Sequence, residues 1–247
     1  MNKKKTKIII TGGSSGFGHL IASYFYKKLY DVTILDIKKS KLKNINFIRT
    51  DLSKKKVQNL LKNIKFKNTK KIVLINCAVW KSKKNISNEN YSDWQRTFSV
   101  GLFSNFFLTR NISELSIKNK IKCNIINIGS VLSKLVSTNQ AASYHALKSA
   151  VESLTRVLAI NYISEYLTFN TISLGFVKKS NSKRSSKLNK LIKNTKKLAK
   201  TKKIGDENCI IECIKYLISE PGEYLNGTSI VLDGGLSNIE QFNILDK

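Results

Sequence analysis

The chain has 247 residues, of which 41% are hydrophobic, so it contains enough apolar side chains for a sizeable core and general disorder is excluded. A single proline and 12 glycines exclude collagen-like and proline-rich low-complexity classes. Lysine and arginine outnumber aspartate and glutamate by 44 to 16, which gives a formal net charge of +28.

This positive charge consists almost entirely of lysine. Only five of the 44 basic residues are arginine, the side chain that recognises phosphates and bases through two parallel hydrogen bonds. The lysines are scattered over expected helix surfaces and loops, so no specific nucleic-acid binding is predicted. The densest basic segment is 178–203, which has 12 basic residues among 26 and no acidic residue.

Cysteines and apolar runs indicate the compartment. No apolar run approaches the roughly 20 residues that a membrane span requires, so no membrane contact is expected. Four cysteines occur without a CxxC pair, which favours reduced thiols in a cytoplasmic protein. No metal site is predicted either.

Short apolar runs alternate along the chain with longer segments of helical periodicity. In chain order we expect a strand at 7–11, a helix at 20–29, strands at 32–36 and 46–50, a helix capped by Ser53, a strand at 72–76, a helix at 94–117, a strand at 122–128, a helix at 142–166, a strand at 168–174, a helix at 207–219 and a strand at 228–232. This order predicts an α/β fold of the Rossmann type, in which a doubly wound, mostly parallel seven-stranded sheet has helices on both faces. Neither a linker nor a repeat is evident, so residues 1–247 are expected to form a single domain.

A glycine-rich turn follows the first expected strand and opens the first helix. Its sequence is Thr11-Gly12-Gly13-Ser14-Ser15-Gly16-Phe17-Gly18. Gly12 allows a tight turn, Gly16 lets the backbone approach a pyrophosphate, and Gly18 allows close packing of the helix on the strand. The helix N-terminus supplies free N–H groups for phosphates. Because the turn lies between a strand and a helix, it predicts a dinucleotide site.

Asp36 ends the second expected strand, 18 residues beyond Gly18. A carboxylate there can accept hydrogen bonds from the adenosine ribose hydroxyls and would repel a 2′-phosphate. Lys38 and Lys39 follow closely and would offset part of that repulsion. The sequence therefore favours NAD over NADP.

Tyr144 and Lys148 are four residues apart on an expected helix and therefore share a face. An ammonium group lowers the pKa of a neighbouring phenol, which makes the phenol a better acid–base catalyst. Ser130, at the end of the fifth strand, could orient a substrate oxygen against Tyr144. The spacing alone proves nothing, because Tyr24 and Lys28 repeat it on the first helix, where we interpret them as a surface pair.

Together these motifs resemble the short-chain dehydrogenase/reductase family, in order and over nearly the whole chain. The resemblance implies that Tyr144 is the acid–base, that Lys148 lowers its pKa and holds the nicotinamide ribose, and that Ser130 holds the substrate. It also implies a tetramer built through the two long helices, a homodimer being the other possibility. The cofactor contacts that it implies are at Gly12, Ser14, Ser15, Gly16, Phe17, Gly18, Asp36, Asp51, Leu52, Asn76, Ala78, Tyr144, Lys148 and Val177.

The chain departs from the family pattern in the long helix before the fifth strand. An asparagine that supports a proton relay in the family is replaced here by Gly101. Asn105 lies one helical turn further on the same face and is a candidate substitute, although a turn displaces it by more than 5 Å. The family's Asn-Asn-Ala-Gly becomes Asn76-Cys77-Ala78-Val79, so a glycine beside the cofactor is lost.

Two functional hypotheses follow. The first is an NAD(P)-dependent oxidoreductase that transfers hydride between nicotinamide and a small-molecule carbonyl or secondary alcohol. Its substrate could be anionic or bound to a carrier protein, because the basic segment 178–203 lies where the family has a substrate lid; 3-oxoacyl carrier-protein reductases and sugar-modifying enzymes are the subclasses considered. The alternative is a dinucleotide-binding sensor or scaffold with weak or lost catalysis, suggested by Gly101 and Val79.

Overall fold

The computed structural model describes residues 3–178 and 185–238 and contains one seven-stranded sheet. The strands lie in the order β3-β2-β1-β4-β5-β6-β7, and every neighbouring pair is parallel. Their bounds are Thr6–Thr11 (β1), Asp31–Asp36 (β2), Asn46–Arg49 (β3), Lys71–Asn76 (β4), Lys122–Ser130 (β5), Leu167–Leu174 (β6) and Ser229–Leu232 (β7). The expected Rossmann-type fold is confirmed.

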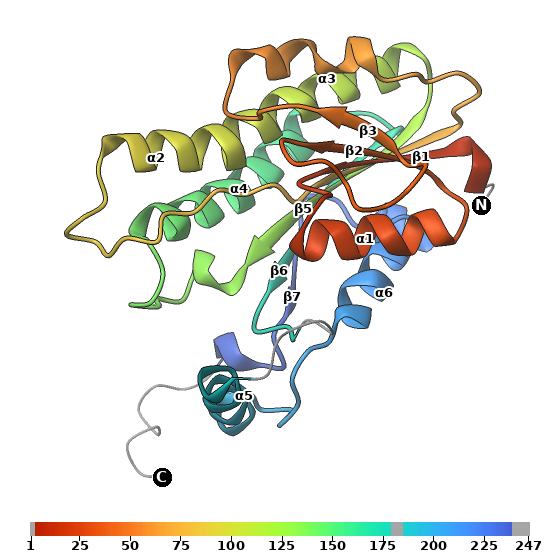
Figure 1. The fold of residues 1–247 in the computed structure, drawn as a ribbon. Helices are drawn as coiled ribbons and strands as arrows, with labels where there is room; N and C mark the ends of the chain where they lie inside the picture. The colour runs from red at the N-terminus through yellow and green to blue at the C-terminus, as the bar shows by residue number, and fades with distance from the viewer. Residues whose placement is uncertain (1–2, 179–184, 239–247) are drawn as a thin grey trace.

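Helices cover both faces of this sheet (Figure 1). The α-helices are α1 (Gly16–Lys27), α2 (Tyr91–Phe98), α3 (Ser104–Lys118), α4 (Ala142–Asn161), α5 (Ser186–Leu198) and α6 (Glu207–Leu217). The 3₁₀-helical segments are η1 (Lys3–Lys5), η2 (Lys55–Asn63), η4 (Val131–Ser133), η5 (Pro221–Tyr224) and η6 (Leu236–Asn238), and η3 (Ser99–Phe103) is π-helical. No helix among the described residues is both long and apolar enough to cross a membrane.

Two hydrophobic cores lie on opposite faces of the sheet because successive strand side chains point to opposite sides. Ile8 and Ile10 of β1 pack with the apolar faces of α1 and α6, whereas Ile9 packs with α3, α4 and η2. All three isoleucines are fully buried. A strand buried on both faces needs a continuous apolar run, which is why 7–11 and 72–76 were recognisable in the sequence.

Three expected helices differ from the structure. The segment after β3 is the 3₁₀ helix η2, and its N-cap is Lys54 rather than Ser53, because the Ser53 hydroxyl donates to the Asp51 carboxylate (2.7 Å). The expected helix at 94–117 begins earlier, at Tyr91, and is interrupted by the π-helical turn η3. The expected helix at 142–166 ends at Asn161.

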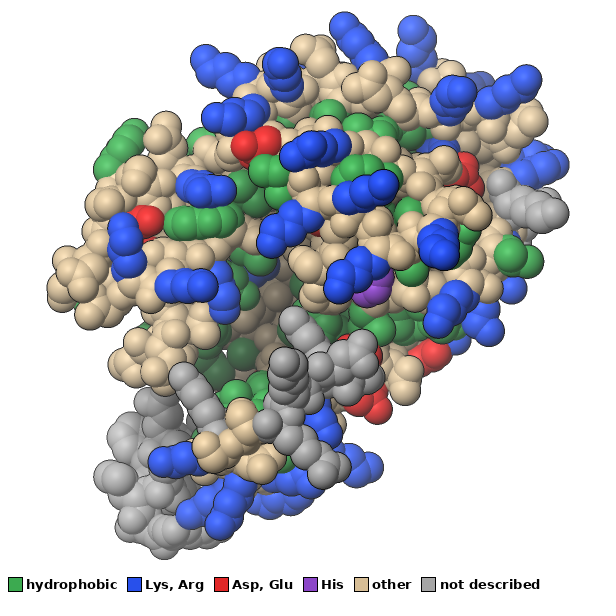
Figure 2. Space-filling view, viewed as in Figure 1, with side chains coloured by type: hydrophobic (Ala, Val, Ile, Leu, Met, Phe, Trp, Pro, Cys, Tyr) green, Lys and Arg blue, Asp and Glu red, His purple; other side chains and the backbone are tan. Residues whose placement is uncertain are grey.

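Lysine and arginine side chains are spread over the face seen in Figure 2, with few carboxylates among them. The described part of the basic segment 178–203 includes α5, where lysines 190, 193, 196 and 197 are exposed, and Lys200 just after it is exposed too. Residues 179–184 of that segment lie outside the described residues.

Candidate active site

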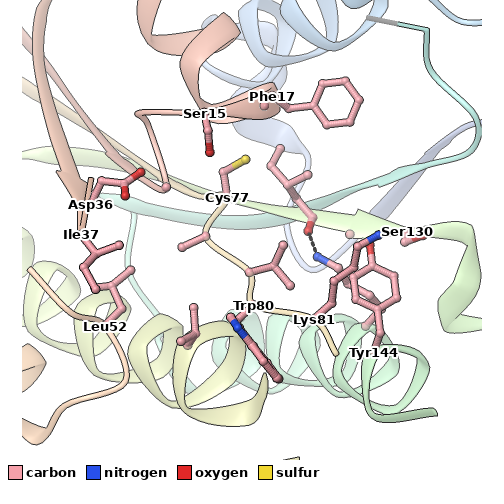
Figure 3. A pocket seen from close by; sticks show the side chains of 18 of the residues that line it. Ser15, Phe17, Asp36, Ile37, Leu52, Cys77, Trp80, Lys81, Ser130 and Tyr144 are labelled. Carbon is pink, nitrogen blue, oxygen red and sulfur yellow. Dashed lines mark hydrogen bonds between the residues drawn. The ribbon is translucent and has the colours of Figure 1, made fainter. Parts of the chain in front are cut away.

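A cleft of about 680 Å³ opens at the carboxyl ends of the strands. It lies where the strand order reverses, since β1 pairs with β2 on one side and with β4 on the other. Open parallel sheets bind ligands at this switch point. Segments far apart in the chain line it: the glycine turn, the ends of β2, β4, β5 and β6, and the start of α4 (Figure 3).

The glycine turn has the shape that a dinucleotide phosphate requires. Gly12 and Gly16 have φ angles of +70° and +56°, which only glycine adopts without strain. A Cβ at Gly12 would lie 2.8 Å from Ala78 Cα, and one at Gly18 would clash with the Gly12 carbonyl. Ser15 is the N-cap residue of α1, but its side chain accepts no hydrogen bond from the first turn. The N–H groups of that turn therefore remain available to an anion. These residues fit a dinucleotide.

The Asp36 carboxylate is fixed at the end of β2 and faces the cleft. Its Oδ2 accepts from the Ser14 backbone N–H (3.0 Å), and its Oδ1 accepts from the Lys38 N–H (2.9 Å). The Ser14 hydroxyl donates to the Lys38 carbonyl (2.6 Å). Each carboxylate oxygen retains a lone pair, so Asp36 can still accept from ribose hydroxyls.

Most of the residues named from the sequence reach this cleft. Those that line it are Gly12, Ser15, Gly16, Phe17, Asp36, Asp51, Leu52, Ala78, Ser130, Tyr144 and Lys148. A hydrogen bond from Ser53 holds the pKa of Asp51 below its usual value, so Asp51 is an anion at neutral pH. Ser14, Gly18, Asn76 and Val177 do not line the cleft.

Asn76 is buried beneath the cleft in a polar network. Its Nδ2 donates to Asn105 Oδ1 (3.0 Å) and Asn127 Oδ1 (2.9 Å), and Asn105 Nδ2 also donates to Asn127 (3.0 Å). From there the network continues through Thr155 to Thr171. Asn105, the candidate substitute for the family asparagine, is buried in this network and does not line the cleft.

The space beside Gly101 is filled by Leu147 instead. A Cβ at Gly101 would lie 2.5 Å from Leu147 Cδ2 and 2.9 Å from Cδ1. Leu147 is fully buried, and Gly101 lies within the π turn η3. A larger side chain at position 101 would therefore require Leu147 to shift.

Ser130, Tyr144 and Lys148 meet at one wall of the cleft (Figure 3). Ser130 lies close enough to Tyr144 for its hydroxyl to lower the pKa of the phenol. Lys148 Nζ donates to the Ile128 carbonyl (2.6 Å) and lies 5.6 Å from the centroid of the Tyr144 ring. The ammonium therefore sits over the phenol ring.

A distant carboxylate holds the first turn of α4, on which Tyr144 lies. Ala141 at the N-cap has no side-chain acceptor, and Glu89 from the loop before α2 accepts from both the backbone N–H (3.2 Å) and the hydroxyl of Ser143. An acidic group at a helix N-terminus also interacts favourably with the helix dipole. The ring of His145 bridges Ala141 and Ser137 and fixes the preceding loop.

Burial shifts the pKa values of both Tyr144 and Lys148. It raises the pKa of Tyr144, and the hydrogen bond from Ser130 opposes this only in part. The expectation of a lowered phenol pKa is thus not met, because desolvation by burial outweighs the effect of Ser130. Burial lowers the pKa of Lys148 to about 8. The buried carboxylate of Glu152, one turn further along α4, opposes that fall.

Tyr24 and Lys28 are a surface pair, as interpreted from the sequence. Lys28 is exposed at the end of α1, and its Nζ lies 6.0 Å from the Tyr24 ring centroid. Neither residue lines the cleft.

Several cleft residues were missed by reasoning from motifs. Trp80 and Lys81 follow β4, and Arg96 of α2 lies 5.0 Å from the Trp80 ring. The available signal was their position just after a buried parallel strand, since such loops form the ligand-binding edge. Their distance from Tyr144 in the sequence gave no indication that they would share a wall with it.

The glycine turn and the helix N-terminus open into a cleft at the switch point of a parallel sheet. This is the fold of a dinucleotide-binding protein. Residues 12–237 match the family model described as Enoyl-(Acyl carrier protein) reductase. The chain belongs to the short-chain dehydrogenase/reductase family, so the family resemblance seen in the sequence is confirmed.

Two relatives match this chain over nearly its whole length, with about a quarter of the residues identical. Glucose 1-dehydrogenase 2 of Bacillus subtilis is 26% identical, with 93% of each chain covered. A 3-oxoacyl-(acyl-carrier-protein) reductase of Buchnera aphidicola subsp. Schizaphis graminum is also 26% identical and covers 96% of this chain and 99% of its own. The protein is thus an NAD(P)-dependent oxidoreductase.

Solved structures agree with this assignment. A 4-hydroxyisoleucine dehydrogenase complexed with NADH has a TM-score of 0.82 and 28% identity over 95% of this chain and all of that one. The same enzyme complexed with NADH and succinate has a TM-score of 0.83 and 27% identity, covering 94% of this chain and 100% of that one. Aldohexose dehydrogenase of Thermoplasma acidophilum, with a TM-score of 0.84 and 24% identity over 97% of each chain, shows the fold alone.

Proposed function

We propose that this protein is an NADH-dependent reductase that converts a ketone into a secondary alcohol, with Ser130, Tyr144 and Lys148 as its catalytic residues. The observation that carries the proposal is that Ser130, Tyr144 and Lys148 line the same cleft as the glycine turn, with Lys148 Nζ 5.6 Å from the centroid of the Tyr144 ring. When bound, the nicotinamide supplies the hydride that adds to the carbonyl carbon.

The three side chains divide the proton chemistry among them. Tyr144 donates its phenolic proton to the carbonyl oxygen, so the oxygen becomes the alcohol hydroxyl and Tyr144 becomes a phenolate. Ser130 hydrogen-bonds to the same oxygen and orients it. The Lys148 ammonium stabilises the negative charge that forms on Tyr144. Solvent then returns a proton to the phenolate.

The raised pKa of Tyr144 favours the reductive direction. A phenol whose pKa lies above its ordinary value carries its proton at neutral pH, as a general acid must. Oxidation of an alcohol would need the phenolate, which burial disfavours here. We therefore assign carbonyl reduction as the physiological direction.

Reduction should fail as the pH rises through about 8. Below that pH the Lys148 ammonium is charged, and above it the neutral amine no longer stabilises the developing phenolate. We expect kcat/KM for reduction to be constant near pH 6.5 and to fall above about pH 8, as measured in a pH–rate profile. Because Glu152 raises the pKa of Lys148, Glu152→Gln should move the fall to lower pH. A profile that is flat to pH 10 in both proteins contradicts the role of Lys148.

Asp36 supports NADH rather than NADPH as the cofactor. Its carboxylate is buried, and both of its oxygens are fixed by backbone N–H groups at the edge of the cleft. A 2′-phosphate placed there would lie against a negative charge that cannot turn away. Lys38 also lines the cleft and supplies some compensating charge.

Removing this charge should change the cofactor preference. Asp36→Asn keeps one acceptor oxygen for the backbone and removes the repulsion, so we expect the ratio of the NADPH to the NADH dissociation constant to fall at least tenfold. Titration of cofactor fluorescence measures both constants. Asp31→Asn, at the other end of β2, is the matched control and should leave the ratio unchanged. If wild type already binds NADPH more tightly than NADH, the assignment to NAD is wrong.

The substrate proposed here is a small ketone bearing an anionic group. Exposed lysines on α5 lie in the segment expected to form the substrate lid. The 4-hydroxyisoleucine dehydrogenase that this chain resembles was solved with succinate, a dicarboxylate. The sugar dehydrogenases and carrier-protein reductases among the relatives define the other substrates to be screened.

Exposed apolar side chains support self-association through the long helices. On and after α4, Val157, Ile160 and Ile163 are 52%, 76% and 96% exposed, and Phe103 next to α3 is 50% exposed. Covering them with a second copy of the chain would remove this surface from water. We propose a single-domain subunit in a homotetramer or homodimer in the cytoplasm, and analytical ultracentrifugation tests the assembly.

The function is tested by a cofactor titration followed by a substrate screen. NADH and NADPH are titrated first, and a panel of neutral and anionic ketones is then reduced with the cofactor that binds more tightly. Turnover of at least one ketone supports the proposal. Tight NADH binding without turnover of any ketone or alcohol would establish the alternative, a dinucleotide-dependent sensor or scaffold, which the replacement of the family asparagine by Gly101 favours.

A further inference from the structure

Lys81 places a second ammonium group beside the Tyr144 ring, on the side of the loop that follows β4. Its Nζ lies 5.6 Å from the ring centroid, the same distance as Nζ of Lys148. Lys148 is buried, whereas Lys81 is exposed and lines the cleft (Figure 3). The phenol thus has one cation inside the protein and another facing the ligand.

The loop that carries Lys81 is held at several points. Ser82 is buried directly after it, and Lys84 forms an ion pair with Asp93 of α2 (2.7 Å). Further along, Glu89 is bound to the first turn of α4. The backbone at Lys81 is therefore fixed relative to Tyr144, and its ammonium points to a defined part of the cleft.

The charge of Lys81 is not neutralised by the protein that the structure describes. Its Nζ donates to the neutral Gln140 Oε1 (3.1 Å), and no carboxylate of residues 3–178 or 185–238 forms an ion pair with it. An ammonium group has three donors, so further hydrogen bonds remain for a ligand. The cation–π contact with Tyr144 is weak at an exposed site and does not account for the placement of the charge.

We propose that Lys81 binds the carboxylate of the substrate, and that the substrate is a short oxo acid whose ketone is reduced at Tyr144. This rests on the proposed function and names its substrate class. Because Nζ lies so close to the phenol ring, an anion bound to Lys81 and a carbonyl bound to Tyr144 belong to one small molecule only a few bonds long. The neutral Gln140 side chain holds the Lys81 ammonium in place and leaves its positive charge available to the substrate carboxylate.

The test compares oxo acids with their methyl esters, which keep the ketone and lose the charge. We measure kcat/KM of the full chain with NADH for 2-oxobutanoate, 3-oxobutanoate and 4-oxopentanoate and for the three esters. Wild type should prefer at least one acid over its ester by tenfold or more. Lys81→Met should lower kcat/KM for that acid at least tenfold, mainly through KM, and should reduce the acid-to-ester ratio to near one. Lys81→Arg should retain most of the preference.

Lys83→Met is the matched control, because Lys83 is an exposed lysine two residues along the same loop that does not line the cleft. It should leave the acid-to-ester ratio unchanged. Equal losses on acids and esters in Lys81→Met, or a wild type that prefers the esters, would overturn the proposal while leaving the reductase function intact.

A binding measurement separates this proposal from the proposed function. Succinate is titrated by calorimetry into the protein saturated with NADH, so no turnover is needed. Millimolar binding that weakens at least fivefold in Lys81→Met and persists in Lys83→Met supports the carboxylate site even if no ketone is reduced. Binding that is absent, or equal in the two variants, contradicts the site.

Discussion

Tyr144→Phe should lower kcat/KM for ketone reduction by about 10³-fold, within the range that general acid catalysis contributes. The substitution removes one oxygen, the atom proposed to hold the proton for the substrate. The ring remains, so the contacts of Lys148 and Lys81 with it are kept. The dissociation constant of NADH, measured by fluorescence, should change by less than a few-fold.

Tyr24→Phe is the matched control for this result. It removes the same atom from the other tyrosine that has a lysine four residues later, on a helix surface away from the cleft. Its kcat/KM should equal that of wild type. If Tyr144→Phe keeps more than a tenth of the wild-type rate with a good ketone, Tyr144 is not the acid and the assignment of all three catalytic roles fails.

Gly101→Asn should destabilise the protein by about 2 kcal/mol, the usual size of an overpacking effect in a filled core. The first added carbon would lie 2.5 Å from Leu147 Cδ2, so the fully buried Leu147 side chain would have to shift within the core. We expect the midpoint of thermal unfolding to fall by roughly 4–8 °C.

A double-mutant cycle identifies the cause. Leu147→Ala alone leaves a cavity and should cost about 2–5 kcal/mol. In the double variant the asparagine side chain fills part of that cavity. The free energy of unfolding that the double variant loses should therefore be clearly smaller than the sum of the losses in the two single variants. Lys118→Asn, at the exposed end of α3, controls for placing asparagine in this helix and should change stability little. Strict additivity would show that the two sites do not share the space.

Gly101 and Leu147 also bear on how a Tyr144 phenolate would recover its proton. Gly101 has no side chain, the space beside it holds Leu147, and Asn105 is hydrogen-bonded to Asn76 and Asn127. If Tyr144 is the acid as proposed, we therefore expect its proton to return without the help of a side chain at this point of the helix. If turnover proves slow although NADH binds tightly, this wall of the cleft is the first place to look for the reason.

Much of the fold was predictable because its signals are local. Strands buried on both faces require continuous apolar runs, and 72–76 was recognised for that reason. Helix ends were less predictable. The π turn η3 interrupts the helix that the sequence predicted as continuous, and η2 is a 3₁₀ helix although its sequence also suits an α-helix. No residue near either segment in the chain encodes these outcomes.

The sequence by itself determined the order of strands and helices, the glycine turn, the acid at the end of β2 and the shared face of Tyr144 and Lys148, because each depends on residues close together in the chain. The tertiary structure decided which groups surround the phenol. Lys81 lies 63 positions before Tyr144, and Glu89 holds the helix start from 54 positions before Ser143. It also decided that burial raises the pKa of Tyr144, since desolvation depends on how the whole chain packs around a group.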